Sequence, residues 1–257
     1  MASVKINSFE LDYAWHGPSP DEASTIVFLH EGLGCVEMWR DFPEQVASKT
    51  GLGALVYSRA GYGKSDPISL PRPVTFMHRE ALEVLPEIIN AFGIGDPILF
   101  GHSDGGSIAL IYAGSDQPTR AKALVLEAPH VFVEPLSITS IETAKVEYEK
   151  GSLKSGLQRY HGDNLECAFR GWNDVWLNPE FRSWNIESFL PNISSPVLLI
   201  QGENDQYGTQ CQLESISASC RGPVQTELLA DCGHSPHRDQ PQIVLEVVSS
   251  FLTRRSD

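Results

Sequence analysis

The sequence predicts an α/β fold in which a mostly parallel sheet of eight strands carries helices on both faces. Two observations lead to this prediction. Short apolar runs alternate along the chain with stretches of helical spacing, as expected where a helix joins each parallel strand to the next. The alternation stops once, between residues 130 and 195, and then resumes, which indicates a single insertion.

The chain begins with a predicted hairpin. Residues 3–15 alternate in polarity, which favours two antiparallel strands with one covered face. Residues 25–30 (TIVFLH) and 53–58 (GALVYS) are continuous apolar runs, as expected for strands buried on both faces of a sheet. A helix is expected between these two strands, from about residue 36 to residue 48.

The middle of the chain continues the alternation. Residues 76–92 have helical apolar spacing, and residues 107–114 predict a second helix between buried strands at 97–102 and 122–129. The apolar face of the first helix is expected to hold Leu82, Leu85, Ile89 and Phe92. After the insertion, the same pattern gives strands and helices at residues 196–202, 209–219, 224–230 and 242–252.

Residues 130–195 differ in composition from the rest of the chain. They show no buried-strand pattern and contain nine aromatic residues, several of them at helical spacing. We therefore expect a core domain of residues 1–129 and 196–257, with a helical cap formed by residues 130–195. Trp172 and Trp176 are then candidates to border a substrate pocket. The alternative is a helical excursion that packs wholly on itself.

Composition and charge exclude several classes of partner. The 257 residues carry a net charge of −14, which argues against nucleic acid and anionic membranes. No apolar run approaches the roughly 20 residues of a membrane span, and the N-terminus lacks the pattern of a signal peptide. Five cysteines without CxxC spacing fit reduced thiols better than disulfides or a zinc site. We expect a cytoplasmic protein that acts on a small molecule without metal or cofactor. The sequence carries no pattern that indicates an oligomeric state.

A G-x-S-x-G pattern occurs at residues 101–105, between a predicted buried strand and a predicted helix. A nucleophile in such a turn needs a strained backbone that exposes its hydroxyl, and small neighbours avoid collisions with strand and helix. Backbone N–H groups at the start of the helix can also stabilise negative charge. This context favours Ser103 as a nucleophile over a serine that merely occupies a glycine-rich turn.

A serine nucleophile needs a base, and the base needs a carboxylate to orient it. Both should follow strands, because ligands of parallel sheets bind beyond the carboxyl ends of the strands. His234 follows the last strand and is the favoured base, whereas His237 is the reserve and is expected to start the final helix. Asp205 follows the strand at 196–202 and is the favoured acid, with Glu127 as the alternative.

With these residues in the order Ser, Asp, His, the sequence resembles the α/β-hydrolase superfamily over nearly its whole length. Besides the serine turn, the matching segments are His30-Glu31-Gly32-Leu33-Gly34, residues 59–65, Gly202-Glu203-Asn204-Asp205 and Gly233-His234. Family members usually have His-Gly where this chain has His30 and Glu31. The resemblance implies an α/β-hydrolase fold and an oxyanion hole made by the backbone N–H groups of Gly32 and Asp104. Leu33 is the alternative donor if the loop register differs by one.

The resemblance also implies a reaction. Ser103 would attack a carbonyl carbon while His234 takes its proton, and water would hydrolyse the acyl-enzyme. The layout is similar to lidded esterases and carbon–carbon bond hydrolases, including the valacyclovirase-like (biphenyl hydrolase-like) branch. A serine at the elbow argues against epoxide hydrolases and dehalogenases, which use a carboxylate there. Carbon–carbon bond hydrolases, cofactor-free perhydrolases and a hydrolase-like ligand receptor remain alternatives to an esterase.

Two carboxylates are candidates for substrate contact. The Asp104 side chain either caps the following helix or borders the site and attracts a cationic group, as the valacyclovirase-like resemblance suggests for amino-acid esters. Glu31 could add to the same negative field, or face water as loop glutamates usually do. Leu33, Trp172 and Trp176 are the apolar candidates for the pocket.

Overall fold

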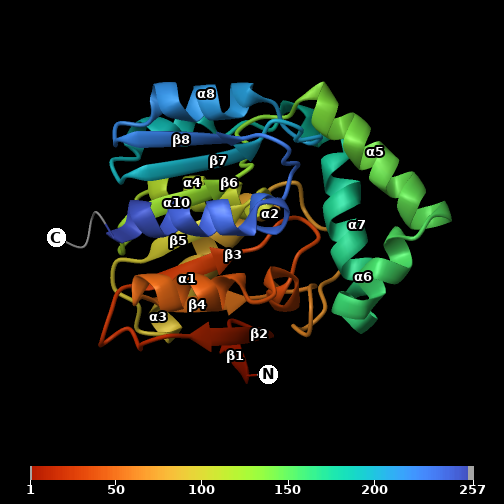
Figure 1. Cartoon of the computed structure of the whole chain (residues 1–257). Coiled ribbons are helices and arrows are strands. Elements are labelled where there is room, and N and C mark those ends of the chain that lie inside the picture. Colours follow the sequence, from red (N-terminus) through yellow and green to blue (C-terminus); the bar gives the residue numbers. More distant parts are fainter. Residues whose placement is uncertain (1, 254–257) are drawn as a thin grey trace.

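The computed structural model describes residues 2–253 and is built on one eight-stranded sheet (Figure 1). Its strands are β1 (Ala2–Ile6), β2 (Phe9–His16), β3 (Thr25–Leu29), β4 (Gly53–Tyr57), β5 (Ile98–His102), β6 (Ala123–Glu127), β7 (Val197–Gly202) and β8 (Val224–Leu229). They lie in the order β1-β2-β4-β3-β5-β6-β7-β8. β2 pairs antiparallel with β1 and with β4, and the other neighbours are parallel. The predicted mostly parallel sheet is therefore confirmed.

Helices cover both faces of the sheet. α1 (Phe42–Thr50) and α10 (Pro241–Thr253) lie side by side on one face (Figure 1). The other face is covered by α2 (Phe76–Arg79), α3 (Leu85–Ala91), α4 (Asp104–Gly114) and α8 (Gln210–Ser219). Within residues 2–253, no helix is both long enough and apolar enough to cross a membrane.

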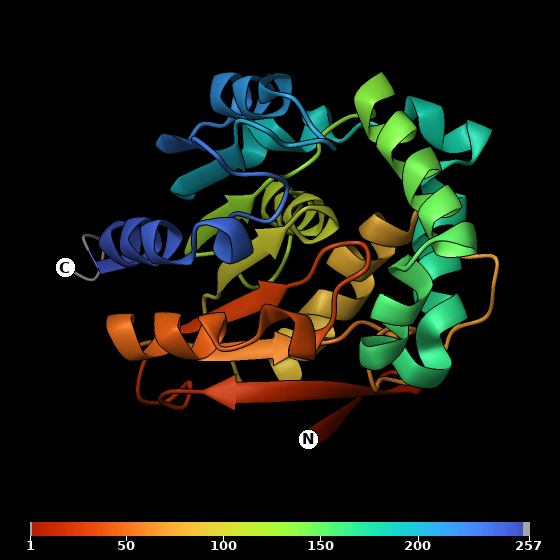
Figure 2. The same ribbon diagram turned by 45° about the vertical axis from the view of Figure 1, so that its right-hand side comes forward.

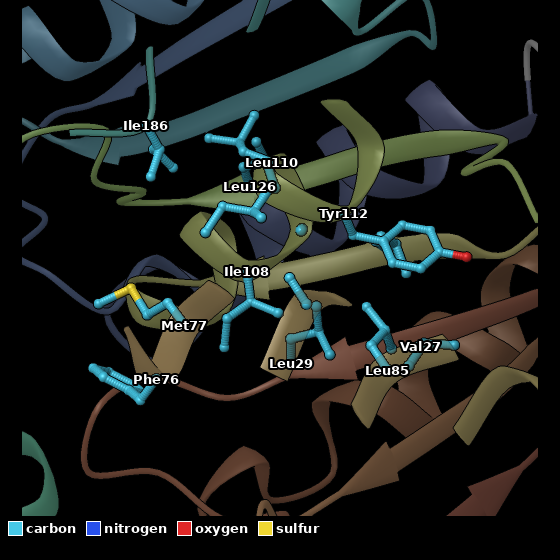
Figure 3. Close-up of a cluster of buried hydrophobic side chains, with 14 of the residues drawn as sticks. Val27, Leu29, Phe76, Met77, Leu85, Ile108, Leu110, Tyr112, Leu126 and Ile186 are labelled. Carbon is cyan, nitrogen blue, oxygen red and sulfur yellow. The ribbon is translucent and has the colours of Figure 1, made fainter. Parts of the chain in front are cut away.

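The central strands divide their side chains between two apolar cores. In β3, Val27 and Leu29 face the core shared with α3 and α4, whereas Ile26 and Phe28 face the core shared with α1 and α10. Figure 3 shows the first of these cores, where Ile108 of α4 lies near Leu29. Because successive side chains of a strand point to opposite faces, a strand covered on both sides must be apolar throughout.

The helix predicted before β5 is divided by a π-helical turn. α2 is followed by a π-helical segment, Glu80–Val84, and then by α3. The prediction that Leu82 lies on the buried apolar face of this helix is wrong, because its side chain is 38% exposed. The buried stripe runs instead through Met77, Ala81 and Leu85, because residues spaced by four share one helix face.

The insertion after β6 is helical and stands over the carboxyl ends of the parallel strands (Figure 2). Its helices are α5 (Pro135–Lys150), α6 (Leu153–His161) and α7 (Leu165–Trp176). His161, at the end of α6, hydrogen-bonds to two loops of the sheet. The N–H of Gly63 donates to its Nδ1 at 3.0 Å, so Nε2 carries the proton and donates to the carbonyl oxygen of Leu33 at 2.9 Å.

Replacing Gly105, in the first turn of α4, by alanine is expected to destabilise the fold. The added Cβ would lie 2.0 Å from the carbonyl oxygen of Leu29, so α4 and β3 would have to separate. We expect the free energy of unfolding, measured in urea, to fall by about 1–3 kcal/mol.

Gly156 provides the matched control, because a Cβ added there, inside α6, would meet no atom of the described residues within 4 Å. Gly156→Ala should therefore raise the free energy of unfolding by about 0.5–1 kcal/mol. Equal urea midpoints for the two variants would contradict the close approach of α4 to β3.

Candidate active site

Ser103 occupies a sharp turn between β5 and α4. Its backbone has φ 53° and ψ −117°, a region that residues other than glycine rarely adopt. The N–H of Ser103 donates to the carbonyl oxygen of Glu127 at 2.9 Å, which ties the turn to the neighbouring strand β6. Such a strained turn is typical of a nucleophile elbow, where it lifts the serine hydroxyl clear of the sheet.

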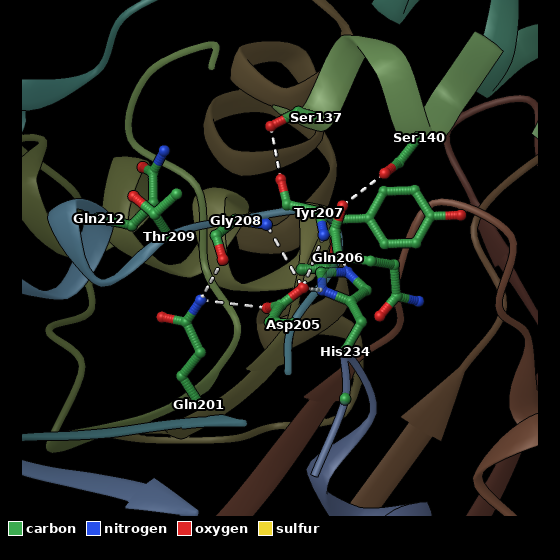
Figure 4. A network of polar contacts seen from close by, with 12 residues as sticks. Ser137, Ser140, Gln201, Asp205, Gln206, Tyr207, Gly208, Thr209, Gln212 and His234 are labelled. Atoms are coloured by element: carbon green, nitrogen blue, oxygen red, sulfur yellow. Dashed lines mark hydrogen bonds and ion pairs between the residues drawn. The ribbon is translucent and has the colours of Figure 1, made fainter. Parts of the chain in front are cut away.

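Three of the predicted side chains meet at this turn. Nε2 of His234 lies 2.9 Å from Oγ of Ser103. Nδ1 of the same ring lies 2.8 Å from Oδ1 of Asp205, a contact that Figure 4 shows. Because an ionised carboxylate only accepts, Nδ1 carries the proton and Nε2 is left to accept from the serine hydroxyl. A general base requires this tautomer and this orientation.

The carboxylate of Asp205 is held by the loop that follows β7. Its Oδ1 accepts the N–H groups of Tyr207 at 2.8 Å and Gly208 at 3.3 Å, and its Oδ2 accepts the side-chain amide of Gln201 at 3.1 Å (Figure 4). Burial opposes ionisation, but His234 and the Tyr207 N–H outweigh it and lower the pKa of Asp205 to about 2. Asp205 is therefore a carboxylate at neutral pH, the form that can stabilise a charged imidazole.

The reserve base and the alternative acid form a pair of their own. Oε2 of Glu127 lies 2.5 Å from Nδ1 of His237, and both side chains are buried. His237 lies in the one-turn helix α9 (Pro236–Asp239), so the expectation that it starts the final helix is wrong. The Gln240 that follows α9 has φ −133° and ψ 53°, which separates the turn from α10.

Glu31 lines the same site and pairs with a buried histidine. Its Oε2 lies 3.5 Å from Nδ1 of His102, the residue before Ser103, and the His102 ring is fully buried. Burial disfavours the charged ring, but Glu31 outweighs it and raises the pKa of His102 to about 9. In return, His102 overcomes the burial of Glu31 and holds the pKa of its carboxyl well below the usual range.

The loop with the predicted oxyanion donors is held from behind by Arg59. The guanidinium of Arg59 donates to the carbonyl oxygens of His30 at 2.6 Å and Glu31 at 2.9 Å. Since C=O and N–H point in opposite directions across a trans peptide, the Gly32 N–H points away from Arg59. Asp104 begins α4, so its N–H has no intrahelical acceptor. Neither N–H group is therefore engaged by Arg59 or by the hydrogen bonds within α4.

A cavity of about 210 Å³ opens beside Ser103 and His234. Its apolar lining comes mainly from the insertion and the loop after β3: Leu33, Met38, Ile141, Leu153, Leu157, Trp172, Trp176 and Tyr207. Its polar lining includes Glu31, His102, His130, Ser137, Ser235 and Arg238. We call residues 30–34, which contain the predicted donor Gly32, the oxyanion loop. Trp172 packs directly against it, since a Cβ on Gly32 would come within 2.2 Å of the Trp172 ring.

The Asp104 carboxylate is buried and is not among the groups that line the cavity. Its Oδ1 accepts the indole N–H of Trp176 at 3.1 Å, and its Oδ2 is buried without a hydrogen-bond partner among residues 2–253. Burial raises the pKa of Asp104 to about 6, although Arg59 and the Trp176 N–H act in the opposite direction. The side chain therefore bonds to the insertion, and neither caps α4 nor borders the cavity.

Met38, His130 and Tyr207 are among the lining residues that the sequence analysis does not name. His130 and Tyr207 face His234 with ring centroids 5.7 Å and 4.7 Å away, and Met38 adds to the apolar wall. His130 comes shortly after β6, so its place beyond a strand end was a usable signal. Burial lowers the pKa of His130 to about 3, so its ring is neutral.

One group of side chains has the composition of a metal site. Ligand atoms of His102, Glu127 and His237 lie within 4.8 Å of one another, and all three residues are buried. An ion there would have to replace the hydrogen bond between His237 and Glu127. The acylation chemistry available to Ser103 makes no use of such an ion.

The chain is similar to known hydrolases. The model of the alpha/beta hydrolase family matches residues 26–247. The proline iminopeptidase of Lactobacillus delbrueckii subsp. lactis is 29% identical over 92% of this chain and 92% of its own. Epoxide hydrolase 3 of Xenopus tropicalis is 22% identical over 91% of this chain and 73% of its own.

The fold likewise has close counterparts among solved structures. A thermophilic esterase from Thermogutta terrifontis has a TM-score of 0.77 with this chain at 19% identity, and the match covers 100% of both chains. At that identity the likeness concerns the fold alone. The family match extends from β3 into α10 and includes every segment that meets at Ser103. The protein is a hydrolase, and the chain belongs to the alpha/beta hydrolase family.

Proposed function

We propose that the protein is a serine hydrolase that cleaves a small carboxylic ester through a covalent acyl-enzyme. One observation carries this proposal. A continuous hydrogen-bonded chain runs from Asp205 through His234 to the hydroxyl of Ser103, which opens onto a largely apolar cavity. Such a chain activates a hydroxyl that is otherwise a weak nucleophile at neutral pH.

The proposed reaction has two steps with the same proton carrier. Oγ of Ser103 attacks the ester carbonyl carbon while Nε2 of His234 takes the hydroxyl proton, and Asp205 stabilises the charged imidazole. The N–H groups of Gly32 and Asp104 hold the oxyanion until it collapses, and His234 then protonates the departing alcohol. A water molecule, deprotonated by His234, attacks the acyl-enzyme and releases the acid and free Ser103.

The cavity supports a small, largely apolar substrate. Its volume of about 210 Å³ lies below the roughly 300–1,000 Å³ that is typical of pockets for drug-sized ligands. Trp172 closes it above the oxyanion loop, and Leu153 and Leu157 close it from α6. A short acyl or alcohol group fits this space.

One relative is an epoxide hydrolase, but the opening of an epoxide is the less favoured reaction for this chain. In that class a carboxylate at the elbow attacks the substrate, whereas this chain has Ser103 there. The neighbouring Asp104 carboxylate is buried against Trp176 and is not among the cavity's lining groups. The nucleophile available to a bound substrate is therefore the serine hydroxyl.

Ser103→Ala is expected to reduce kcat on a short-chain nitrophenyl ester by at least about 10⁴-fold, because the nucleophile is lost. Ser155→Ala, on the exposed side of α6, is the control and should retain full activity. Release of nitrophenol measures both. Activity that persists without Ser103 would overturn the proposal, and one equivalent of alcohol per site from the unmodified protein would favour a ligand receptor.

Trp172→Ala should open the cavity above the oxyanion loop and favour longer acyl chains. We expect the ratio of kcat/KM for long over short esters to rise roughly 10-fold, the scale on which a hydrophobic pocket discriminates chain length. Trp184→Ala, in the same insertion but outside the cavity lining, is the control for lost packing. Equal ratios in both variants, with losses that follow the melting temperature, would count against this role.

Asp104→Asn tests whether the carboxylate recognises a cationic substrate. Because Asp104 lies outside the cavity lining, the preference between an amino-acid ester and its des-amino analogue should not change. The variant should, however, be more stable at pH 8. Folding raises the pKa of Asp104 to about 6, so the unfolding free energy falls as pH rises through the interval between its unfolded and folded values.

The asparagine cannot ionise and escapes this loss, which is on the order of 1–3 kcal/mol. The difference in stability from the unmodified protein should be smaller at pH 4 than at pH 8, as measured by urea unfolding. A preference that collapses with Asp104→Asn would instead assign the carboxylate to substrate binding.

A further inference from the structure

We propose that Glu31 and His102 are positioning residues whose ion pair holds the oxyanion loop, the nucleophile elbow and the loop of His234 in one arrangement. The proposal rests on the proposed roles of Ser103 and His234. It gives a function to two side chains that the proposed reaction leaves unused.

His102 contacts all three segments of the site. It precedes Ser103 in the chain, its Nε2 lies 2.6 Å from the backbone carbonyl oxygen of His234, and its Nδ1 faces Glu31 at 3.5 Å. A carbonyl oxygen only accepts, so Nε2 carries a proton. Nδ1 has no hydrogen-bond partner among residues 2–253, and the Glu31 carboxylate lies at ion-pair distance from it. When Nδ1 is also protonated, His102 holds the loop of His234 by a hydrogen bond and the oxyanion loop by charge.

The oxyanion loop is shaped around the Glu31 carboxylate. A Cβ on Gly34 would come within 2.2 Å of Oε2 of Glu31, so the loop leaves room for the carboxylate only because residue 34 is glycine. The Gly34 N–H also donates to the Glu31 carbonyl oxygen at 3.1 Å, which closes the loop into a tight turn. Gly32, the proposed oxyanion donor, lies inside this turn.

Charged and titratable groups face His102 from every element packed around it. Glu31 comes from the loop after β3 and Glu127 from β6, and both favour the charged ring. The rings of His234 and His237 lie with their centroids 5.3 Å and 5.2 Å from that of His102. His237 is already bonded to Glu127, so Glu31 is the carboxylate left for His102.

Loss of this pair should slow the chemistry more than it weakens substrate binding. His102 fixes the backbone of the same residue whose ring must lie 2.9 Å from Oγ of Ser103. A displacement of about 1 Å in such a contact can cost on the order of 100-fold in rate. A buried charge without its partner is also strongly unfavourable. Removing one side chain of the pair should therefore displace the other from its position.

The experiment measures how fast a neutral fluorophosphonate labels Ser103, together with kcat and KM for a neutral ester, between pH 6 and pH 10. All variants are compared well below their melting temperatures. His102→Leu removes both ring contacts, His102→Gln keeps a side-chain N–H directed at the His234 carbonyl, and Glu31→Gln removes the charge. Glu214→Gln, on the exposed surface of α8, is the control for the loss of a glutamate charge.

We expect His102→Leu to slow labelling and kcat by roughly 10- to 100-fold with KM nearly unchanged, and His102→Gln to recover most of the rate. In the unmodified protein, labelling should fall as pH rises through about 9, where His102 loses its proton. Glu31→Gln removes the group that raises this pKa, so the fall should begin at lower pH.

Three results would overturn the positioning role: His102→Leu labelled as fast as the unmodified protein, no recovery with glutamine, or an alkaline limb that does not move with Glu31→Gln. A change in KM alone would also overturn it, and would assign Glu31 to substrate binding. An unmodified protein that fluorophosphonate does not label, or that is labelled without Ser103, would refute the proposed function itself and with it this proposal.

Discussion

The close approach of α4 to the sheet at Ser103 is the constraint on which the rest of the structure depends. The helix starts so near the end of β3 that the space beside the Leu29 carbonyl admits no side chain at residue 105. At the same turn the backbone of Ser103 lies in a region of positive φ, and the serine side chain lines the cavity. The two apolar cores stabilise that strained turn, because they hold the strand before it and the helix after it.

The parts of the fold that the sequence predicts are those that follow from local patterns. Continuous apolar runs mark the buried strands, and a polar residue beyond a strand end marks Ser103, Asp205 and His234 as neighbours. Leu82 escapes this reasoning because the buried stripe of its helix passes through Ala81, and the π-helical segment that holds both residues packs against α4. Short-range periodicity does not contain that information.

Pairing between side chains was harder to predict than their position. Glu127 ends a strand and Asp205 follows one, and both His234 and His237 come after the last strand, so spacing alone allows either carboxylate to serve either histidine. The structure forms two separate pairs, Asp205 with His234 and Glu127 with His237. The first pair joins the loop beyond β7 to the loop beyond β8, whereas the second joins the end of β6 to α9. The orientation of the Asp104 side chain likewise depends on a hydrogen bond from a residue far away in sequence, Trp176.

The contact of His161 with Leu33 has a consequence for how substrate-selecting insertions can change within such a fold. The end of α6 holds a carbonyl of the loop that carries the proposed oxyanion donor, and it also binds the N–H of Gly63. His161 thus ties the helices that line the cavity to the loop that is proposed to stabilise charge. An insertion taken from a relative would need a residue that replaces His161 in these contacts. A change of the cavity would therefore also change the support of the loop that carries the proposed oxyanion donor.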